Sequence, residues 1–308
     1  MSKSAIRFPL AILLLTAAAP LLSADSIQGS FERSYSVSGP VALEVLTRSG
    51  DISVRSGPSG TVTVRGKIHV GDRWFTGNRQ SDVNEIEKNP PITQSGNSIR
   101  IDYLNYHDIS LDYEITAPAD TSVQTHSGSG DQKMEGLSGK LNLESGSGDM
   151  RLRDVSGEMR IHTGSGDVDG HGISGAFSVE CGSGDVRIDA NGEGGDSRVR
   201  TGSGNIELRG VKGGLQAESG SGDVTISGTQ TAAWEIRTSS GNVELELQPG
   251  AAFDLEATAG SGNVIVDGPV SITVQGDLRK ARHAIQGKVG GGGPLMTVHT
   301  GSGDVHIH

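Results

Sequence analysis

The sequence predicts an all-β protein, a parallel β-solenoid built from repeats of about 18 residues with a short helical insertion near the N-terminal end. Three observations support this. Ser-Gly-Asp or Ser-Gly-Asn occurs eleven times, apolar and polar residues alternate on both sides of it, and glycine makes up 47 of 308 residues. Alternation with a period of two indicates strands, and successive repeats of similar length stack as a solenoid. Collagen is excluded because the glycines have no three-residue period.

The composition narrows the class of partner. The formal net charge is −11, which disfavours binding to a phosphate backbone, so we expect no nucleic-acid partner. Aromatic residues are only 4% of the chain and hydrophobic residues 33%, which suits a fold that buries small side chains in many thin layers.

Residues 1–24 have the three parts of a secretory signal peptide. Lys3 and Arg7 precede an apolar run over 8–22, and small residues end at Ala24, after which we expect cleavage. A retained membrane anchor is the alternative, but the run is shorter than the ~20 residues of a spanning helix. We therefore expect export to the periplasm, the cell surface or the extracellular space, with no transmembrane segment in the mature chain.

Residues 25–120 are predicted to form an N-terminal β region that is continuous, as one domain, with the repeats of 121–308. Its strand-like runs are Val41–Leu46, Ile52–Arg55, Val62–Val70, Ile99–Tyr103 and Ile109–Ile115. Residues 72–91 break the pattern, and with Ser81 as N-cap they predict a short helix or lid. We expect this insertion, which contains Trp74, to cover the open end of the solenoid, with ligand binding as the alternative.

The repeat is marked by its acid or amide, whose spacings from Asp131 onward are 18, 18, 18, 20, 18, 19, 21 and 41. The last interval suggests two repeats plus a loop at 290–293. The marker residues are Asp51, Asn97, Asp131, Asp149, Asp167, Asp185, Asn205, Asp223, Asn242, Asn263 and Asp304.

A glycine directly before the acid or amide is present in every copy, which predicts a positive φ at this position. The earlier glycine of the motif is replaced in some copies, so we expect it merely to fit best. The predicted turn glycines are Gly130, Gly148, Gly166, Gly184, Gly204, Gly222, Gly241, Gly262 and Gly303.

Four residues before each marker lies a small residue, which predicts one narrow inward column. Cys181 belongs to it and is expected to pack rather than react. The outward residue before the column largely alternates in sign, as in Glu144, His162 and Glu180, which predicts solvated charge ladders between neighbouring coils. The column comprises Thr47, Thr93, Ser127, Ser145, Thr163, Cys181, Thr201, Ser219, Thr238, Ala259 and Thr300.

These features resemble the bacterial putative-adhesin family of β-strand-repeat proteins over nearly all of 28–308. That family has no established function or catalytic residues, so the resemblance implies an exported, non-enzymatic surface or envelope protein. The stretches that carry it are Ala42–Val45, Ser49–Ile52, Asn89–Ile92, Ala117–Asp120 and Thr163–Val168.

Two roles remain open at this stage: binding to a protein or glycan surface, and a structural scaffold that associates with itself. A third is a solenoid stabilised by calcium, because Asp131, Asp149, Asp167 and Asp185 would form a row of carboxylates. The competing interpretation is that each side chain hydrogen-bonds the backbone of its own turn. We favour that interpretation, because asparagine replaces aspartate in several copies, and expect no cofactor.

Catalysis is the least favoured class. The few aromatic residues leave little to build a sugar-binding platform, and the serines beside aspartate recur too regularly to be one activated nucleophile. We therefore expect no catalytic residues. The pair His306 and His308, with His299 nearby, could chelate a metal, but a frayed C-terminal strand is the favoured interpretation.

Overall fold

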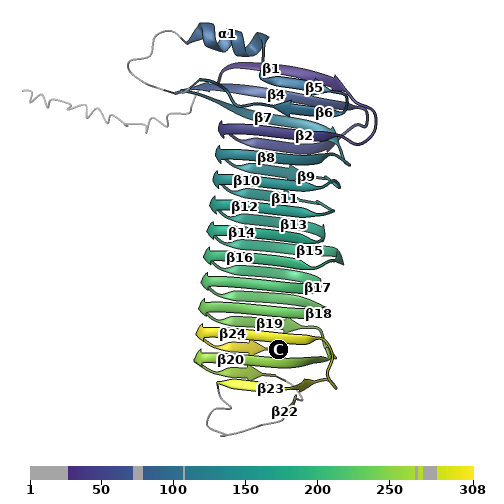
Figure 1. Ribbon diagram of the computed structural model, residues 1–308, viewed down its shortest axis with the longest axis vertical. Coiled ribbons are helices and arrows are strands. Elements are labelled where there is room, and N and C mark those ends of the chain that lie inside the picture. The colour runs from purple at the N-terminus through teal and green to yellow at the C-terminus, as the bar shows by residue number, and fades with distance from the viewer. Residues whose placement is uncertain (1–26, 72–78, 107, 268–269, 273–282) are drawn as a thin grey trace, which may run out of the picture.

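The computed structural model describes residues 27–71, 79–106, 108–267, 270–272 and 283–308 (Figure 1). The predicted signal peptide and Trp74 lie outside these residues. The described chain is all-β apart from helix α1 (Gln80–Lys88), and its strands are mostly parallel in a β-solenoid-like stack. None of the described helical structure is long and apolar enough to cross a membrane.

Each coil contains two strands that run in opposite directions and belong to two layers (Figure 1). Pairing is parallel and in register, so Leu141 lies between Val123 and Met159 of the neighbouring coils. The first layer includes β8 (Ser122–Ser129), β10 (Leu141–Ser147), β12 (Met159–Ser165), β14 (Phe177–Ser183) and β16 (Ser197–Ser203). The second includes β9 (Gln132–Glu135), β11 (Met150–Arg153), β13 (Val168–Gly175) and β15 (Val186–Gly194). Strands β17 (Ile206–Ser221) and β18 (Val224–Ser240) pass from the second layer to the first.

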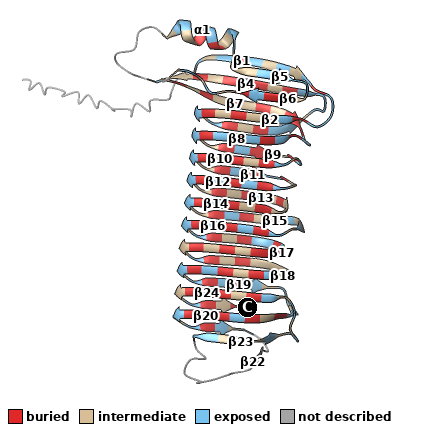
Figure 2. Ribbon diagram, in the orientation of Figure 1, coloured by how far each residue is buried: buried red, intermediate tan, exposed pale blue. Residues whose placement is uncertain are grey.

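Buried residues alternate with more exposed ones along the strands of both layers (Figure 2), so alternate side chains fill the interior. The buried indole of Trp234 donates a hydrogen bond from Nε1 to the carbonyl oxygen of Gly213 at 2.8 Å, which satisfies its polar atom. The predicted small column is buried at every position except Thr93, which is exposed in a hairpin. Hydroxyls of the column donate to backbone carbonyls, as Thr163 does to Ser165 and Ser219 to Gly204. Small residues therefore fit here because they both fill a narrow space and bind backbone.

The N-terminal end of the stack is antiparallel. There, β1 (Ile27–Ser36) pairs with β4 (Thr61–Val70), which pairs with β7 (Ile109–Pro118), while β5 (Ile92–Ser95) and β6 (Ser98–Ile101) form a hairpin. Helix α1 lies beside β1 and buries Val83 and Ile86 (Figure 1). The prediction of Ser81 as N-cap is wrong. Ser81 lies inside the first turn, and Arg79 occupies the cap position without a capping side-chain bond.

The coils nearest both chain ends are stacked out of sequence order. Strands β2 (Ala42–Ser49) and β3 (Ile52–Gly57) lie between β6/β7 and β8/β9. Likewise β24 (Leu295–Ser302) and β25 (Val305–Ile307) lie between β18/β19 and β20/β21, where β19 is Val243–Leu247, β20 is Phe253–Ser261 and β21 is Val264–Val266.

The interval of 41 residues therefore does not hold two further stacked repeats. The chain leaves β21, forms the antiparallel strands β22 (Val270–Ile272) and β23 (Ala284–Val289) at the end of the stack, and then turns back through Gly290–Gly292. The last repeat, β24 and β25, therefore lies between two coils that precede it in sequence.

Candidate functional site

The Ser-Gly-Asp and Ser-Gly-Asn motifs come together along one edge of the stack, and we call this edge the Ser-Asp corner. Apart from Asn97 and from Asn263 at the end of the row, the Oδ1 of each marker accepts a hydrogen bond from the backbone N–H of the marker in the next coil. The Asp149 N–H donates to Asp131 Oδ1 at 3.0 Å, that of Asp167 to Asp149 at 3.0 Å, and that of Asp185 to Asp167 at 2.8 Å. The prediction that each side chain binds its own turn is thus corrected, because the bonds run between coils.

This ladder explains why asparagine can replace aspartate, since both offer a carbonyl-type Oδ1. Asn205 accepts from Asp223 at 2.9 Å, and Asn242 accepts from Asp304 at 3.0 Å. The ladder begins at Asp112, whose Oδ1 accepts from the N–H of Asp51. Asn97, predicted to mark a repeat, is not part of this ladder: it lies at the β5–β6 hairpin and bonds Ser38 instead. No glycine motif precedes Asp112, so the sequence carries no signal for it.

The structure brings the four candidate calcium ligands into one row, where arginines supply positive charge. Arg151 contacts Oδ2 of Asp131 and of Asp149 at 2.7 Å each, and Arg187 contacts Asp185 and, at 4.0 Å, Asp167. Burial acts to raise the pKa of Asp131, but the hydrogen bonds from Arg151 and the Asp149 N–H outweigh it and hold that pKa below its ordinary value. Mutual repulsion along the row is therefore relieved by protein groups.

The turn glycines explain how the corner can be this tight. All nine predicted positions have positive φ, from +125° at Gly130 to +147° at Gly204 and Gly222. A Cβ on Gly166 would lie 2.2 Å from the carbonyl oxygen of Gly148 in the neighbouring coil. The earlier glycine is more constrained than predicted: its φ is not positive, but a Cβ on Gly164 would lie 2.6 Å from the oxygen of Gly146.

A column of serines beside the aspartates is the feature that the sequence interpretation missed. Neighbouring serines are paired in register, as Ser147 is with Ser165 and Ser165 with Ser183. Nearly all are exposed, so they present hydroxyls at about the 4.8 Å spacing of neighbouring strands. The recurring Ser-Gly-Asp tripeptide was the available signal. The column comprises Ser49, Ser129, Ser147, Ser165, Ser183, Ser203, Ser221, Ser240, Ser302 and Ser261 in stack order.

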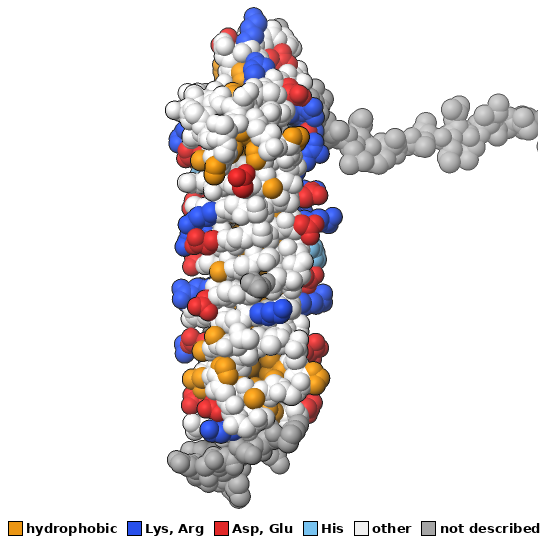
Figure 3. All heavy atoms as spheres, turned by 90° about the vertical axis from the view of Figure 1, so that its right-hand side faces the viewer, with side chains coloured by type: hydrophobic (Ala, Val, Ile, Leu, Met, Phe, Trp, Pro, Cys, Tyr) orange, Lys and Arg blue, Asp and Glu red, His pale blue; other side chains and the backbone are white. Residues whose placement is uncertain are grey.

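The outer surface of the first layer carries the predicted charge ladder. His126 lies 3.1 Å from Glu144, His162 lies 3.7 Å from Glu180, and Arg200 pairs with Glu218 at 2.5 Å. These side chains are about half exposed, so each pair contributes at most ~1 kcal/mol. Figure 3 shows the edge opposite to the Ser-Asp corner, with charged side chains along both sides and a mostly uncharged band between them.

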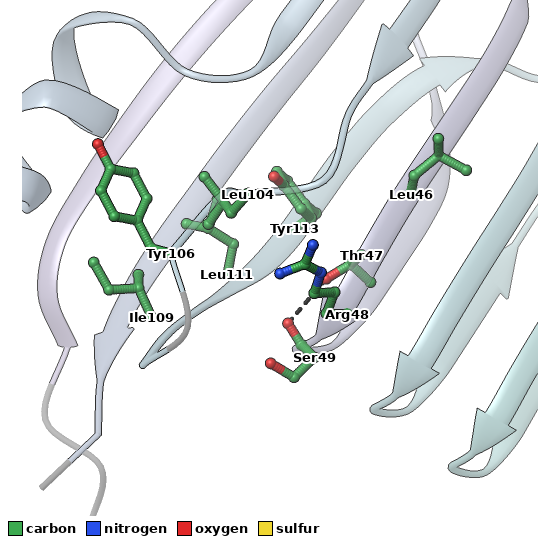
Figure 4. A pocket seen from close by; sticks show the side chains of 9 residues that line it. All are labelled: Leu46, Thr47, Arg48, Ser49, Leu104, Tyr106, Ile109, Leu111 and Tyr113. Atoms are coloured by element: carbon green, nitrogen blue, oxygen red, sulfur yellow. Dashed lines mark hydrogen bonds between the residues drawn. The ribbon is translucent and has the colours of Figure 1, made fainter. Parts of the chain in front are cut away.

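A small cavity lies where β2 ends, between it and the chain leading into β7 (Figure 4). Its volume is about 60 Å³, and it is lined by Leu46, Thr47, Arg48, Ser49, Leu104, Tyr106, Ile109, Leu111 and Tyr113. Ligand pockets usually measure ~300–1,000 Å³. This cavity could hold about two waters but not a sugar ring.

A wider depression of about 410 Å³ lies on the first layer over β2, β8 and β10. Polar groups on its floor and rim include Glu44, Gln124, Lys140, Asn142 and Arg160. Their mixed charges and amides could contact a polar polymer that lies across the face.

Cys181 and the histidines near the C-terminus are the remaining residues that the sequence singled out. Cys181 is buried in the small column, and burial raises the pKa of its thiol, as expected of a packing residue. The expectation of a frayed C-terminal strand is wrong, because β25 pairs with β19 on one side and β21 on the other. His306 and His308 therefore have fixed backbones. His299 lies in the first layer, bonded to Thr258, and is not part of their group.

Comparison with known proteins gives a family and two structural likenesses. A profile of the family described as Toastrack DUF4097 matches residues 41–196 and again residues 155–308. Two solved structures are similar: a putative cell adhesion protein from Clostridium sporogenes (12% identity, 90% of this chain and 98% of the other, TM-score 0.27) and a putative adhesin from Bacteroides fragilis (13% identity, 91% and 98%, TM-score 0.42). No curated protein matches the chain.

Proposed function

The chain belongs to the Toastrack DUF4097 family, and from this premise we propose that it is an exported, non-catalytic protein that binds a protein or glycan surface through its Ser-Asp corner. One observation carries the proposal: the same hydroxyl, glycine and acid or amide recur coil after coil in strict register on an exposed edge. A regular array of weak, identical contacts gives avidity toward a repetitive surface, although each contact contributes little.

The chemistry of the corner suits a polar, repetitive partner. Serine hydroxyls donate and accept hydrogen bonds, and the absence of side chains at Gly146, Gly164 and Gly182 leaves flat backbone beside them. Sugar hydroxyls or the backbone of an extended peptide offer matching donors and acceptors. Repetition also argues against catalysis, because every copy has nearly the same surroundings and none is singled out as an activated nucleophile.

The test measures binding of residues 25–308 to a glycan array and to surfaces coated with peptidoglycan, fibronectin or collagen. A triple variant, Ser147→Ala, Ser165→Ala and Ser183→Ala, removes hydroxyls from the corner. The matched control replaces the serines of the opposite turns, Ser138, Ser156 and Ser174, by alanine. We expect the corner variant to lose at least tenfold in apparent affinity and the control to bind as the wild type does.

Failure of the wild-type protein to bind any of these surfaces would contradict the adhesive function. Equal binding by both triple variants would show instead that the partner contacts another face. Sedimentation velocity over a hundredfold concentration range tests the alternative of a self-assembling scaffold, which requires association that grows with concentration.

Calcium stabilisation is the second alternative, suggested by the row Asp131, Asp149, Asp167 and Asp185. Two features support a structural role for the aspartates as links between coils instead: one oxygen of each accepts from the backbone N–H of the next marker, and Arg151 and Arg187 contact the other oxygens. We expect the same unfolding midpoint in chelator and in about 5 mM calcium, a concentration that exceeds the dissociation constants of weak extracellular calcium sites. A rise with calcium that is lost on Asp149→Asn would assign the row as a ligand set.

A further inference from the structure

Three neighbouring strands of the second layer, β19, β25 and β21, place a group of metal-ligating side chains on one outer face. His306 of β25 is paired in register with Glu244 of β19 on one side and with Ile265 of β21 on the other. His306 and His308 alternate with the buried Val305 and Ile307, so both imidazoles are on the outward side of β25. Asp267 directly follows β21.

The donor atoms of this group converge. Asp267 Oδ2 lies 3.1 Å from His306 Nε2 and 3.2 Å from His308 Nδ1, and the two imidazole rings are 3.8 Å apart between centroids. One donor atom from each of the three residues lies within 4.8 Å of the others. Zinc bonds of ~2.0–2.1 Å in a tetrahedron put ligand atoms about 3.3 Å apart, so little movement is needed to surround an ion.

The backbone holds these side chains in place. The N–H of His308 donates to Leu245 O at 2.9 Å, and the N–H of Asp267 donates to Ile307 O at 2.8 Å. The second nitrogen of His308, Nε2, lies 3.5 Å from Glu244 Oε1. A carboxylate on the far nitrogen of a ligating histidine fixes its tautomer and orientation, which is a usual outer partner in zinc sites.

We propose that Asp267, His306 and His308 bind a divalent transition-metal ion, with zinc the best fit, and that Glu244 positions His308. Two imidazoles and one carboxylate favour zinc, nickel or copper over calcium and magnesium, which prefer oxygen ligands. Three protein ligands leave a fourth position for water or for a group of a partner.

Because of where this group lies in the stack, a bound ion would also link two parts of the fold. The coil of β24 and β25 is inserted between two coils that precede it in sequence. An ion bound by His306, His308 and Asp267 joins β25 to the chain segment that leaves β21. Metal binding therefore stabilises the coil of β24 and β25 in its place between the two earlier coils.

Isothermal titration of residues 25–308 with zinc chloride, together with thermal unfolding in zinc or in chelator, tests this proposal. We expect one ion per chain, a higher unfolding midpoint with zinc and no comparable rise with calcium. His306→Gln and His308→Gln should each weaken zinc binding at least tenfold, while their midpoints in chelator stay close to that of the wild type.

The control is His162→Gln, because His162 is likewise exposed and lies 3.7 Å from a carboxylate but has no second histidine beside it. This variant should bind zinc as the wild type does. The proposal is overturned if zinc does not raise the midpoint, or if the rise persists in the double variant of His306 and His308. A calcium-dependent rise that persists in that variant would report on the Ser-Asp corner instead.

Discussion

Replacing Gly166 by alanine tests the geometry of the corner most simply. Gly166 has φ +138°, a conformation that costs a residue with a Cβ about 1–3 kcal/mol. The new Cβ would also lie 2.2 Å from the carbonyl oxygen of Gly148 and 2.6 Å from its carbon. Both atoms are backbone within the ladder between coils, so relief requires the coils to shift. We expect a total loss of about 3–5 kcal/mol in the free energy of unfolding.

The matched variant is Gly164→Ala, two residues earlier in the same turn. Gly164 has no positive φ, and its Cβ would lie 2.6 Å from Gly146 O. Ser239 occupies the equivalent position in another coil, between neighbouring coils on both sides, which shows that a Cβ can be accommodated there. Alanine also reduces the entropy of the unfolded chain, so the net loss should be about 1 kcal/mol or less.

Thermal unfolding followed by circular dichroism at 218 nm or by calorimetry separates the two variants. With roughly 2 °C per kcal/mol for a chain of this size, Gly166→Ala should lower the midpoint by about 6–10 °C and Gly164→Ala by about 2 °C or less. Equal midpoints, or a larger loss for Gly164→Ala, would refute the argument from positive φ.

Two further predictions concern the aspartate row. Asp167→Asn keeps the Oδ1 acceptor for the Asp185 N–H and should change stability by less than about 0.5 kcal/mol, whereas Asp167→Ala should cost about 1–2 kcal/mol, as measured by urea unfolding. The lowered pKa of Asp131 stabilises the fold above the ordinary carboxyl pKa of 3.8, and this contribution is lost as pH falls through the lower folded value. Arg151→Gln removes the hydrogen bond that lowers this pKa, so the midpoint of acid unfolding should move to higher pH. An unchanged acid midpoint would mean that Arg151 does not set the pKa of Asp131.

Much of the fold could be predicted from the repeat alone. Alternation predicts which side chains of β10 and β11 are buried, and the glycine that never varies predicts the positive φ of Gly148 and Gly166. Such features depend on the chain within one coil, where local sequence and local structure are coupled. Cys181 in the small column follows from the same logic.

Features that depend on coils pairing out of sequence order, or on residues outside the repeat motif, could not be predicted. The insertion of β24 and β25 between earlier coils leaves no local mark, because similar repeats can pair with either neighbour. Asp112 joins the ladder by its place in space, without the glycine motif. The convergence of Asp267 with His306 and His308 likewise requires knowing that β21 lies beside β25.

The in-register pairing of neighbouring coils implies that an 18-residue coil is an interchangeable unit of the stack, and deletion of residues 150–167 tests this. This deletion joins Asp149 to Val168, which already occupies the place equivalent to Met150 in the next coil. The control deletes residues 150–166 and leaves one extra residue, Asp167, between Asp149 and Val168, in the tight turn where each marker N–H donates to the marker of the preceding coil. We expect cooperative unfolding within a few degrees of the wild type for the 18-residue deletion and a markedly lower midpoint for the control. Similar midpoints for the two deletions, or failure of both to fold, would contradict it.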